Sequence, residues 1–443
     1  MNKFSYFFLI LILGCSLNSD SAFWTKSKKA ETDKSITKIL FKDVKPNENE
    51  FNPKLKVNLP KSKIKSISHN LNNDGFTNGK IISNNISKFK FSKIENFSGY
   101  EPEILVDNKN VFFFDSKGSV IKFSKGSKIE WKKNYYSKSD KKNNPILFLA
   151  SEGNNLFVAD NNANYYLLNK ENGNLKWKKK HTSSFNSQIK IKDDRIFVVD
   201  MENTLRCFSI KNGDILWSVP TEFTVVSSQK KQSIIIVGNL VIFSNSIGDL
   251  TAVDYKNGEI IWQTPTQILK FANNITLRNS DIVSDGNLVF LSSNKNQFTA
   301  LDIKTGIIKW KQEINSEIRP VVISNYIVTI SNEGLMVLLN KNDGNILRIN
   351  NILKNIKKKK REKYHPVGFI ISDGKVYIST KNGRLFIINF SNSELQKILK
   401  LDKEILQRPV YFQRELYIYF IILLLCSRAP ISRSWLNVTT NQM

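Results

Sequence analysis

The side chains that could do chemistry are few and widely separated in this chain of 443 residues. The histidines are His69, His181 and His365, and this separation is unlike the close spacing of paired metal ligands. No Walker loop, nucleophile elbow or His-Glu-x-x-His motif occurs in the sequence. The sequence therefore predicts no catalytic residue and no metal site.

The cysteines, Cys15, Cys207 and Cys426, are too few to form a disulfide framework. Cys207 lies in an apolar run, so we expect it to be buried by packing. Cys15 directly follows the apolar residues 4–13, which are preceded by a lysine and are too short to span a bilayer. This arrangement predicts an export signal over residues 1–14.

The end of the apolar run, Ile12-Leu13-Gly14-Cys15, resembles the lipobox of bacterial lipoproteins. The resemblance implies cleavage before Cys15 and attachment of a diacylglycerol to its thiol. Ser16 in place of aspartate then implies the outer membrane, with the protein facing the periplasm. An ordinary signal peptide followed by an incidental cysteine is the alternative.

Residues 15–80 are rich in lysine, asparagine and serine and show no sustained hydrophobic period. Pro46, Pro53 and Pro60 interrupt them. Such a composition is typical of a flexible linker. We therefore expect a lipid-anchored, flexible tether that precedes a globular body.

A repeat dominates the rest of the sequence. Each copy has two apolar strands, a Gly-containing turn and a short run that closes on tryptophan. Asn-Gly is a strong hairpin signal, and a period of about 40–50 residues with several strands is typical of propeller blades. The recurring tryptophans stand 46, 40, 45 and 48 residues apart: Trp131, Trp177, Trp217, Trp262 and Trp310.

Seven copies lie between residues 101 and 395, and in the sixth Arg348 replaces the tryptophan. An eighth begins at Pro409. We expect the apolar-alternating residues 81–95 to pair with the C-terminal strands, because this would close the ring and remove its open edges. The prediction is an all-β, eight-bladed β-propeller with four-stranded antiparallel blades over residues 81–418.

The tryptophans are expected to be wedges between blades. A single blade cannot bury both faces of its sheet, and a large apolar side chain stabilises the docking of its neighbour. Stacking of these rings on ligands is the weaker alternative, because they recur at one position in the blade.

The repeat resembles the quinoprotein-type eight-bladed propeller superfamily. With the lipobox and the tether, it resembles the BamB family of outer-membrane protein assembly factors over about residues 70–418, and residues 69–75 fit the short segment before that family's first blade. The resemblance implies a non-catalytic scaffold of the outer-membrane β-barrel protein assembly (BAM) complex. It also implies docking on the POTRA domains of BamA with other barrel-assembly subunits, anchoring in outer-membrane lipid through an acylated Cys15, and help in delivering and inserting barrel proteins.

The family's partner loops connect neighbouring blades and match residues 224–233 and 271–281 here. The resemblance implies that Val225 and Val226 supply apolar contacts and that Lys230 or Lys231 replaces an arginine. Arg278 stands near the place of an acidic pair that is not clearly present. Simple solvated connections are the alternative interpretation of these loops.

The enzymatic relatives in the superfamily are dehydrogenases that use pyrroloquinoline quinone, a Ca²⁺ cage and a catalytic aspartate, with an adjacent cysteine pair in the alcohol-oxidising members. The cysteines of this chain are far apart, and its repeat aspartates are periodic, which is typical of turns. We therefore predict no enzymatic activity and no cofactor. A quinone-dependent dehydrogenase and another periplasmic interaction propeller are the alternatives.

The formal net charge of +27 invites a nucleic-acid interpretation. The export signal argues against it, so no nucleic-acid partner is predicted. Residues 354–363 contain seven cations and one anion, 7 − 1 = +6, in a single run. A solvated insertion is the favoured interpretation of this run, and docking to anionic lipid headgroups is the alternative.

The repeat stops after residue 418. Residues 419–426 are continuously apolar where a turn is expected, and arginine and serine become frequent beyond them. We interpret residues 419–443 as an anomalous tail produced by a frameshift or a sequence-end artefact. A membrane anchor is the alternative, although so short an apolar run does not span a bilayer.

Overall fold

A computed structural model describes the following residues of the chain: 49–57, 59, 71–73, 85–90, 103–107, 110–124, 128–223, 228, 230–266, 277–401, 408–412, 415–419 and 423–428. The chain divides into two compact units, Met1–Lys45 and Pro46–Met443. Every element below belongs to the second unit. The predicted signal peptide and Cys15 lie outside the described residues.

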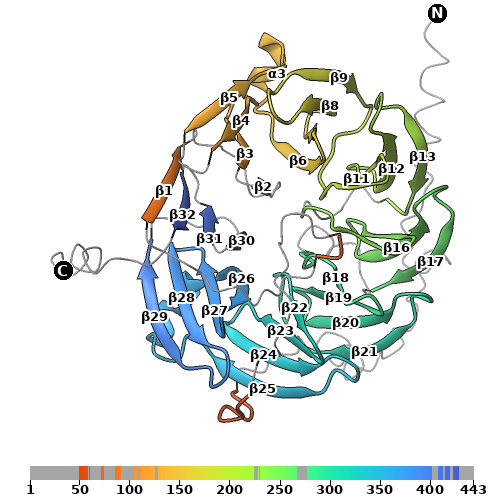
Figure 1. Ribbon diagram of the computed structural model, residues 1–443. Coiled ribbons are helices and arrows are strands. Elements are labelled where there is room, and N and C mark those ends of the chain that lie inside the picture. Colours follow the sequence, from red (N-terminus) through yellow and green to blue (C-terminus); the bar gives the residue numbers. More distant parts are fainter. Residues whose placement is uncertain are drawn as a thin grey trace, which may run out of the picture. The chain divides into compact units, whose positions relative to one another are not determined.

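Eight four-stranded antiparallel sheets are arranged around a common axis in the second unit (Figure 1). This arrangement confirms the predicted eight-bladed β-propeller. Seven of the blades use four strands that are consecutive in sequence, and the eighth combines strands from both ends of the unit.

The first four blades are built as follows. Blade one has β2 (Leu105–Asp107), β3 (Asn110–Phe114), β4 (Val120–Phe123) and β5 (Ile129–Lys133); blade two has β6 (Leu147–Glu152), β7 (Asn155–Asp160), β8 (Asn164–Asn169) and β9 (Leu175–Lys180). Blade three has β10 (Lys190–Lys192), β11 (Arg195–Val199), β12 (Thr204–Ser209) and β13 (Ile215–Pro220); blade four has β14 (Ile234–Val237), β15 (Leu240–Ser244), β16 (Asp249–Asp254) and β17 (Ile260–Pro265).

The other four blades follow the same plan. Blade five has β18 (Val283–Ser284), β19 (Leu288–Ser293), β20 (Gln297–Asp302) and β21 (Ile308–Gln312); blade six has β22 (Val321–Ile323), β23 (Tyr326–Ile330), β24 (Leu335–Asn340) and β25 (Ile346–Asn351). Blade seven has β26 (Pro366–Ser372), β27 (Lys375–Thr380), β28 (Arg384–Asn389) and β29 (Leu395–Lys400); blade eight has β30 (Val410–Phe412), β31 (Glu415–Tyr419), β32 (Leu423–Arg428) and β1 (Asn85–Lys90).

Burial explains why the inner strands look continuously apolar in the sequence. In β11 the side chains from Ile196 to Val199 are all fully buried, because neighbouring blades cover both faces of the sheet. The outermost strands face solvent on one side, and β13 begins with Ile215 and Leu216 about half exposed. The core is therefore a series of clusters between blades.

Strand alternation gives the ring two distinct faces. The connections between blades and the turns between second and third strands lie on one face, here called the loop face. The turns between first and second strands and between third and fourth strands lie on the other, here called the turn face. This follows because successive strands in every sheet are antiparallel.

Blade eight joins the two ends of the unit. Strand β1 pairs with β32 in antiparallel register, with Asn85 opposite Arg428 and Lys90 opposite Leu423. The predicted pairing of residues 81–95 with the C-terminal strands is thus present for β1. Strand β32 lies beyond residue 418, where the sequence repeat stops, and it also pairs with β31.

Each of the five tryptophans lies on an outermost strand and contacts the next blade. The Trp177 indole nitrogen donates a 2.9 Å hydrogen bond to the Ile210 carbonyl, and the ring packs on Gly213. A Cβ at Gly213 would lie 2.6 Å from that ring, and φ there is +72°, so glycine is required. Trp131, Trp217, Trp262 and Trp310 pack in the same way on the glycines at 173, 258, 306 and 344.

The junction between blades six and seven is different. Arg348, which is only 1% exposed, donates hydrogen bonds to the carbonyls of Phe390 (2.8 Å) and Ser391 (2.7 Å). A third bond of 2.7 Å reaches the carbonyl of Leu55, far upstream in the sequence. Ser393, in left-handed conformation with φ +57°, occupies the position held by glycine in the other turns.

Leu55 belongs to residues 49–57, here called the strap (red, below β25 in Figure 1). The strap adds to the outer edge of β25, where Phe51 and Ile349 exchange backbone hydrogen bonds of 3.1 and 2.8 Å. Val57 is buried and donates its amide to Ser391 of blade seven. The strap therefore lies across the blade six–seven junction, inside the segment for which the sequence predicts a tether.

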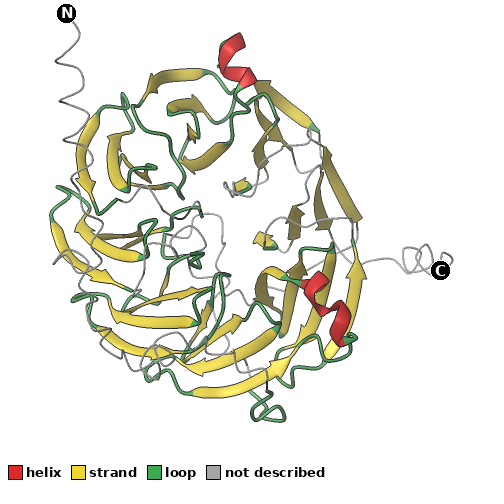
Figure 2. Cartoon of the chain, turned by 180° about the vertical axis from the view of Figure 1, so that it is seen from behind, coloured by secondary structure: helices red, strands yellow, loops and turns green. Residues whose placement is uncertain are grey.

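Two short helices occur in the described residues (red in Figure 2). Helix α3 (Lys138–Lys142) connects blades one and two and begins with a capping box on Ser137. The 3-10 helix η2 (Lys358–Tyr364) connects blades six and seven. In the part of the chain that the structure describes, no helix is long and apolar enough to cross a membrane.

Candidate functional site at the ring centre and the loop face

A short upstream segment, residues 71–73, lies against the innermost strands of blades three to five (Figure 1). The Leu71 carbonyl accepts a hydrogen bond from the Ile236 amide, and the Asn72 carbonyl accepts one from Ser284. The segment that the sequence places before the first blade therefore reaches the ring centre, where these backbone hydrogen bonds hold it.

Asn73 is a hub at the centre of the ring. Its side-chain nitrogen donates 2.9 Å hydrogen bonds to the Gln188 side chain and to the Ile282 carbonyl. Its side-chain oxygen accepts a 2.7 Å bond from the Lys190 ammonium. Burial lowers the pKa of Lys190 to about 7, and the charge of Arg319 acts in the same direction.

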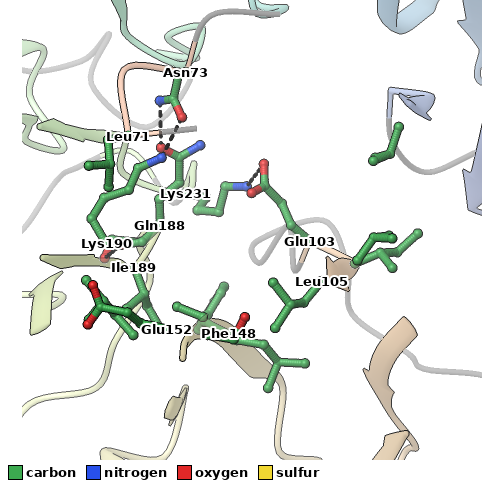
Figure 3. Close-up of a pocket in the computed structure, with 18 of the residues that line it drawn as sticks. Leu71, Asn73, Glu103, Leu105, Phe148, Glu152, Gln188, Ile189, Lys190 and Lys231 are labelled. Atoms are coloured by element: carbon green, nitrogen blue, oxygen red, sulfur yellow. Dashed lines mark hydrogen bonds and ion pairs between the residues drawn. The ribbon is translucent and has the colours of Figure 1, made fainter. Parts of the chain in front are cut away.

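A cavity of about 400 Å³ lies beside this hub. Figure 3 shows Asn73, Gln188 and Lys190 on one side of it and Glu103 on the other, with Lys231 extended toward Glu103. Glu103 accepts contacts of 3.1 Å from both Lys231 and Arg319. Arg319 is also paired with Asp281 through its Nε atom at 2.7 Å.

The cations dominate the electrostatics of this cluster. Burial alone would raise the pKa of Glu103, but the charges of Lys231 and Arg319 outweigh it and hold the pKa at about 2. The same balance, with Arg319 as the strongest opposing charge, holds the pKa of Asp281 well below its usual range. Both carboxylates are thus ionised and already neutralised by neighbours.

The carboxylates of this cluster do not fit a cation such as the Ca²⁺ of the quinone-dependent dehydrogenases. The carboxylates of Glu103 and Asp281 are committed to buried cations, whereas Ca²⁺ needs six to eight free oxygen ligands. Lys190 and Arg408 add further positive charge to the lining. Among the described residues, no group of three or more histidine, cysteine, aspartate or glutamate side chains could hold a metal.

A second cluster lies on the loop face. Glu317, between blades five and six, is paired with the Arg278 guanidinium and lies 3.5 Å from the His365 imidazole. Burial opposes ionisation of Glu317, but the His365 hydrogen bond and the charges of Lys230 and Arg278 hold its pKa at about 2. Connections between three pairs of blades therefore meet at one carboxylate.

The two loops singled out by the resemblance also contact each other. The Ser228 hydroxyl, in the first loop, donates a hydrogen bond to the Leu277 carbonyl in the second. Arg278 donates its backbone amide to Asn294 at 2.9 Å, which fixes the second loop against blade five. The described parts of these loops thus form one surface.

The predicted partner residues are distributed unevenly. Lys230 and Arg278 lie on the loop face, whereas Lys231 is buried and faces Glu103 at the ring centre. Val225 and Val226 lie outside the described residues. Cys207 is buried as expected, and burial raises the pKa of its thiol to about 12.

Sequence reasoning did not single out the central residues Asn73, Glu103, Asp281 and Arg319. They come from distant parts of the chain, and Glu103, Asp281 and Arg319 each lie two residues before the first strand of a blade. For Asn73 the signal was the match of residues 69–75 to the short segment before the first blade of the similar family, and for the other three it was their common position before a first strand.

The fold and the repeat define a quinoprotein-type, eight-bladed propeller. The profile of the family described as outer membrane protein assembly factor BamB matches residues 116–350. The chain belongs to the BamB family. No curated protein matches this sequence significantly.

Many solved structures are similar to this fold, among them the following three. BamB from Moraxella catarrhalis has 13% identity and a TM-score of 0.63, over 78% of this chain and 99% of that one. A europium-containing methanol dehydrogenase has 11% identity and a TM-score of 0.62, over 83% and 89%. The computationally designed Ika8 protein has 10% identity and a TM-score of 0.58, over 76% and 99%.

Proposed function

We propose that this protein is a non-catalytic scaffold subunit of the outer-membrane β-barrel assembly complex. The observation that carries the proposal is the family match over residues 116–350, on a chain whose ring is closed by β1 and β32. In this role it docks on the POTRA domains of BamA, in contact with the other barrel-assembly subunits, and assists the insertion of barrel proteins. Anchoring in the outer membrane through Cys15 belongs to the same proposal.

The chemistry of the ring centre favours a scaffold over a dehydrogenase. Two carboxylates there, Glu103 and Asp281, are neutralised by Lys231 and Arg319. The likeness to the methanol dehydrogenase is a likeness of fold, at 11% identity. Among the described residues, Glu103 and Asp281 are therefore not free to hold the metal ion that a dehydrogenase would need.

We place the partner surface on the loop face, around Lys230 and Arg278. The Arg278 side chain is 38% exposed, and its pairing with Glu317 holds it in one orientation. Lys231 has a different role in this proposal, since it is buried and stabilises Glu103. It holds the loop against the ring centre and does not touch the partner.

The test is co-purification of the full chain with purified POTRA domains of BamA. The wild-type chain is expected to be retained, and the double charge reversal Lys230→Glu with Arg278→Glu is expected to weaken binding by at least about tenfold. The matched control is Lys211→Glu with Lys304→Glu, two exposed lysines on the turn face. Failure of the wild-type chain to bind would contradict the proposal, and equal losses in both double variants would contradict the placement of the surface.

A further inference from the structure

The connection between blades six and seven carries a dense positive charge. Six cations lie within seven residues, at 357, 358, 359, 360, 361 and 363, and Glu362 is the one anion among them. Five of the six are exposed, and Arg361 is partly buried. In the described part of the chain, none of these six forms an ion pair.

This basic connection is held in a fixed shape. Leu353, 2% exposed, anchors its start in the core, and the Tyr364 ring packs edge-on against Phe386 at 5.9 Å at its end. Arg361 folds back and donates a 3.0 Å hydrogen bond from its Nε atom to the Ile356 carbonyl. Helix η2, the lower red helix of Figure 2, thus carries exposed lysines on a connection that is anchored at both ends.

The lysine-rich strand β9 of blade two is a useful contrast. There Lys176 donates to the Asn155 side chain, Lys178 to the Tyr135 carbonyl, and Lys179 is paired with Asp214. Those lysines serve the fold itself. The exposed lysines of η2 show no such side-chain contact among the described residues, so their charge is available to something outside the ring.

The upstream chain reaches the ring beside this helix. Glu50, at the start of the strap, accepts a 3.0 Å hydrogen bond from the Asn351 amide and lies 3.9 Å from the Lys354 ammonium. Asn351 ends β25, and the basic connection begins directly after it. The chain that leads back to Cys15 therefore joins the ring at the foot of η2, on the loop face.

We propose that η2 is a docking surface for the anionic phospholipid headgroups of the membrane in which Cys15 is anchored. This inference rests on the lipid anchoring included in the proposed function. The occupant is a bilayer because the chain that leads from Cys15 reaches the ring beside η2, at Glu50, and because the unpaired positive charge complements anionic lipid. The acyl chain supplies attachment, and η2 sets which side of the ring faces the bilayer.

The test uses the full chain reconstituted into vesicles. Lysine acetylation followed by mass spectrometry compares vesicles of phosphatidylcholine with vesicles containing phosphatidylglycerol. Labelling of the lysines at 357–360 is expected to fall at least about fivefold on the anionic vesicles and to recover in about 0.5 M salt, where the screening length is only a few ångströms. Lys211 and Lys304, on the turn face, are the internal reference and are expected to label equally on both.

A matched variant separates surface binding from loop folding. Replacing the four lysines at 357–360 by glutamine keeps Leu353 and Tyr364 in place and is expected to abolish the protection of Lys363. Equal labelling of η2 on both kinds of vesicle would overturn the inference, as would an absence of association with anionic vesicles. Failure of the scaffold proposal is read separately, because co-purification with POTRA domains needs no membrane.

Discussion

The blade junctions fall into two types, and their difference shows how a repeat tolerates a lost residue. From blade one to blade six, a tryptophan on the outer strand packs on a glycine of the next blade. Between blades six and seven, Arg348 and Ser393 replace that pair, and the strap covers the junction. Arg348 satisfies the same blade-seven carbonyl that an indole would reach, and two further carbonyls besides.

The replacement of tryptophan by Arg348 and the replacement of glycine by Ser393 are physically linked. At the tryptophan junctions, a Cβ on the glycine would lie 2.5–2.8 Å from the indole ring. Ser393 has such a Cβ, so an indole at residue 348 would collide with it. The slender arginine side chain avoids the collision, and the strap supplies the apolar contacts of Val57 that the missing ring would have made.

The largest effect is expected from breaking a tryptophan junction. Trp262→Ala removes the ring packed on Gly306 and its 2.9 Å bond to Ile303, and we expect a loss of about 3–5 kcal/mol in the free energy of unfolding. Urea denaturation measures this loss. Ile261→Ala, at a neighbouring residue that is 47% exposed, is the control and is expected to change stability by less than about 1 kcal/mol. Equal losses in both would contradict the wedge role.

A smaller loss is expected at the arginine junction. Arg348→Met keeps the length of the side chain but removes its hydrogen bonds to the carbonyls of Leu55, Phe390 and Ser391. Among the described residues, only Ser391 keeps another donor, the Val57 amide. We expect a loss of about 2–3 kcal/mol in the free energy of unfolding. The strap is expected to loosen with it. Hydrogen exchange at the amides of Phe51 and Ile349 measures this, and unchanged protection there would show that the strap is held independently of Arg348.

The linkage between Arg348 and Ser393 predicts a coupling of about 1–2 kcal/mol. Arg348→Trp alone is expected to be destabilising because the ring meets the Ser393 Cβ. Adding Ser393→Gly is expected to recover part of the loss by rebuilding the tryptophan junction. A double-mutant cycle measured by urea unfolding tests this, and strictly additive effects would mean that the two residues are unrelated.

The smallest effect on stability is expected at the ring centre. Unlike the blade junctions compared above, the ring centre contains a carboxylate whose protonation changes the free energy of unfolding. The pKa of Glu103 is about 2 in the folded chain against 4.5 ordinarily, so its stabilisation is present above about pH 4.5 and is lost as the pH falls toward 2. Glu103→Gln is expected to flatten that acid dependence. At neutral pH it is expected to cost about 1 kcal/mol or less, because the Glu103 side chain is 42% exposed to the cavity.

Acid unfolding of Trp262→Ala and Arg348→Met provides the comparison. Neither substitution removes a group that titrates between pH 2 and pH 5, so both variants are expected to keep the wild-type acid slope. A flattened slope in either would place an acid-sensitive contact at the blade junctions.

The sequence was sufficient to predict the structural features that repeat from blade to blade. The Gly-to-Trp spacing and the paired apolar strands predicted the blades, and the alternation in residues 81–95 predicted where ring closure occurs. The blade signals are local and recur many times, so each copy supports the others. The replacement of the repeated tryptophan by Arg348 could be recognised in the sequence for the same reason.

The features that occur once were not predictable in the same way. The contacts of Asn73 with Gln188 and Ile282, and of Arg348 with Leu55, join residues far apart in sequence and depend on the completed ring. Residues 49–57 have the composition of a tether and still dock, because an open strand edge offers them hydrogen bonds. Strand β32 lacks the turn and Gly signals, so only its pairing partners define it.

The pairing of β1 with β32 also sets the order of events when the chain folds. Asn85 lies opposite Arg428, so blade eight cannot form until nearly the whole sequence is available. Contacts so distant in sequence form late and slowly, because a very long loop must close first. Blades one to seven can assemble in turn before that point, because each uses strands that are consecutive in sequence. A chain released early would therefore carry two unpaired strand edges until its final strand arrives.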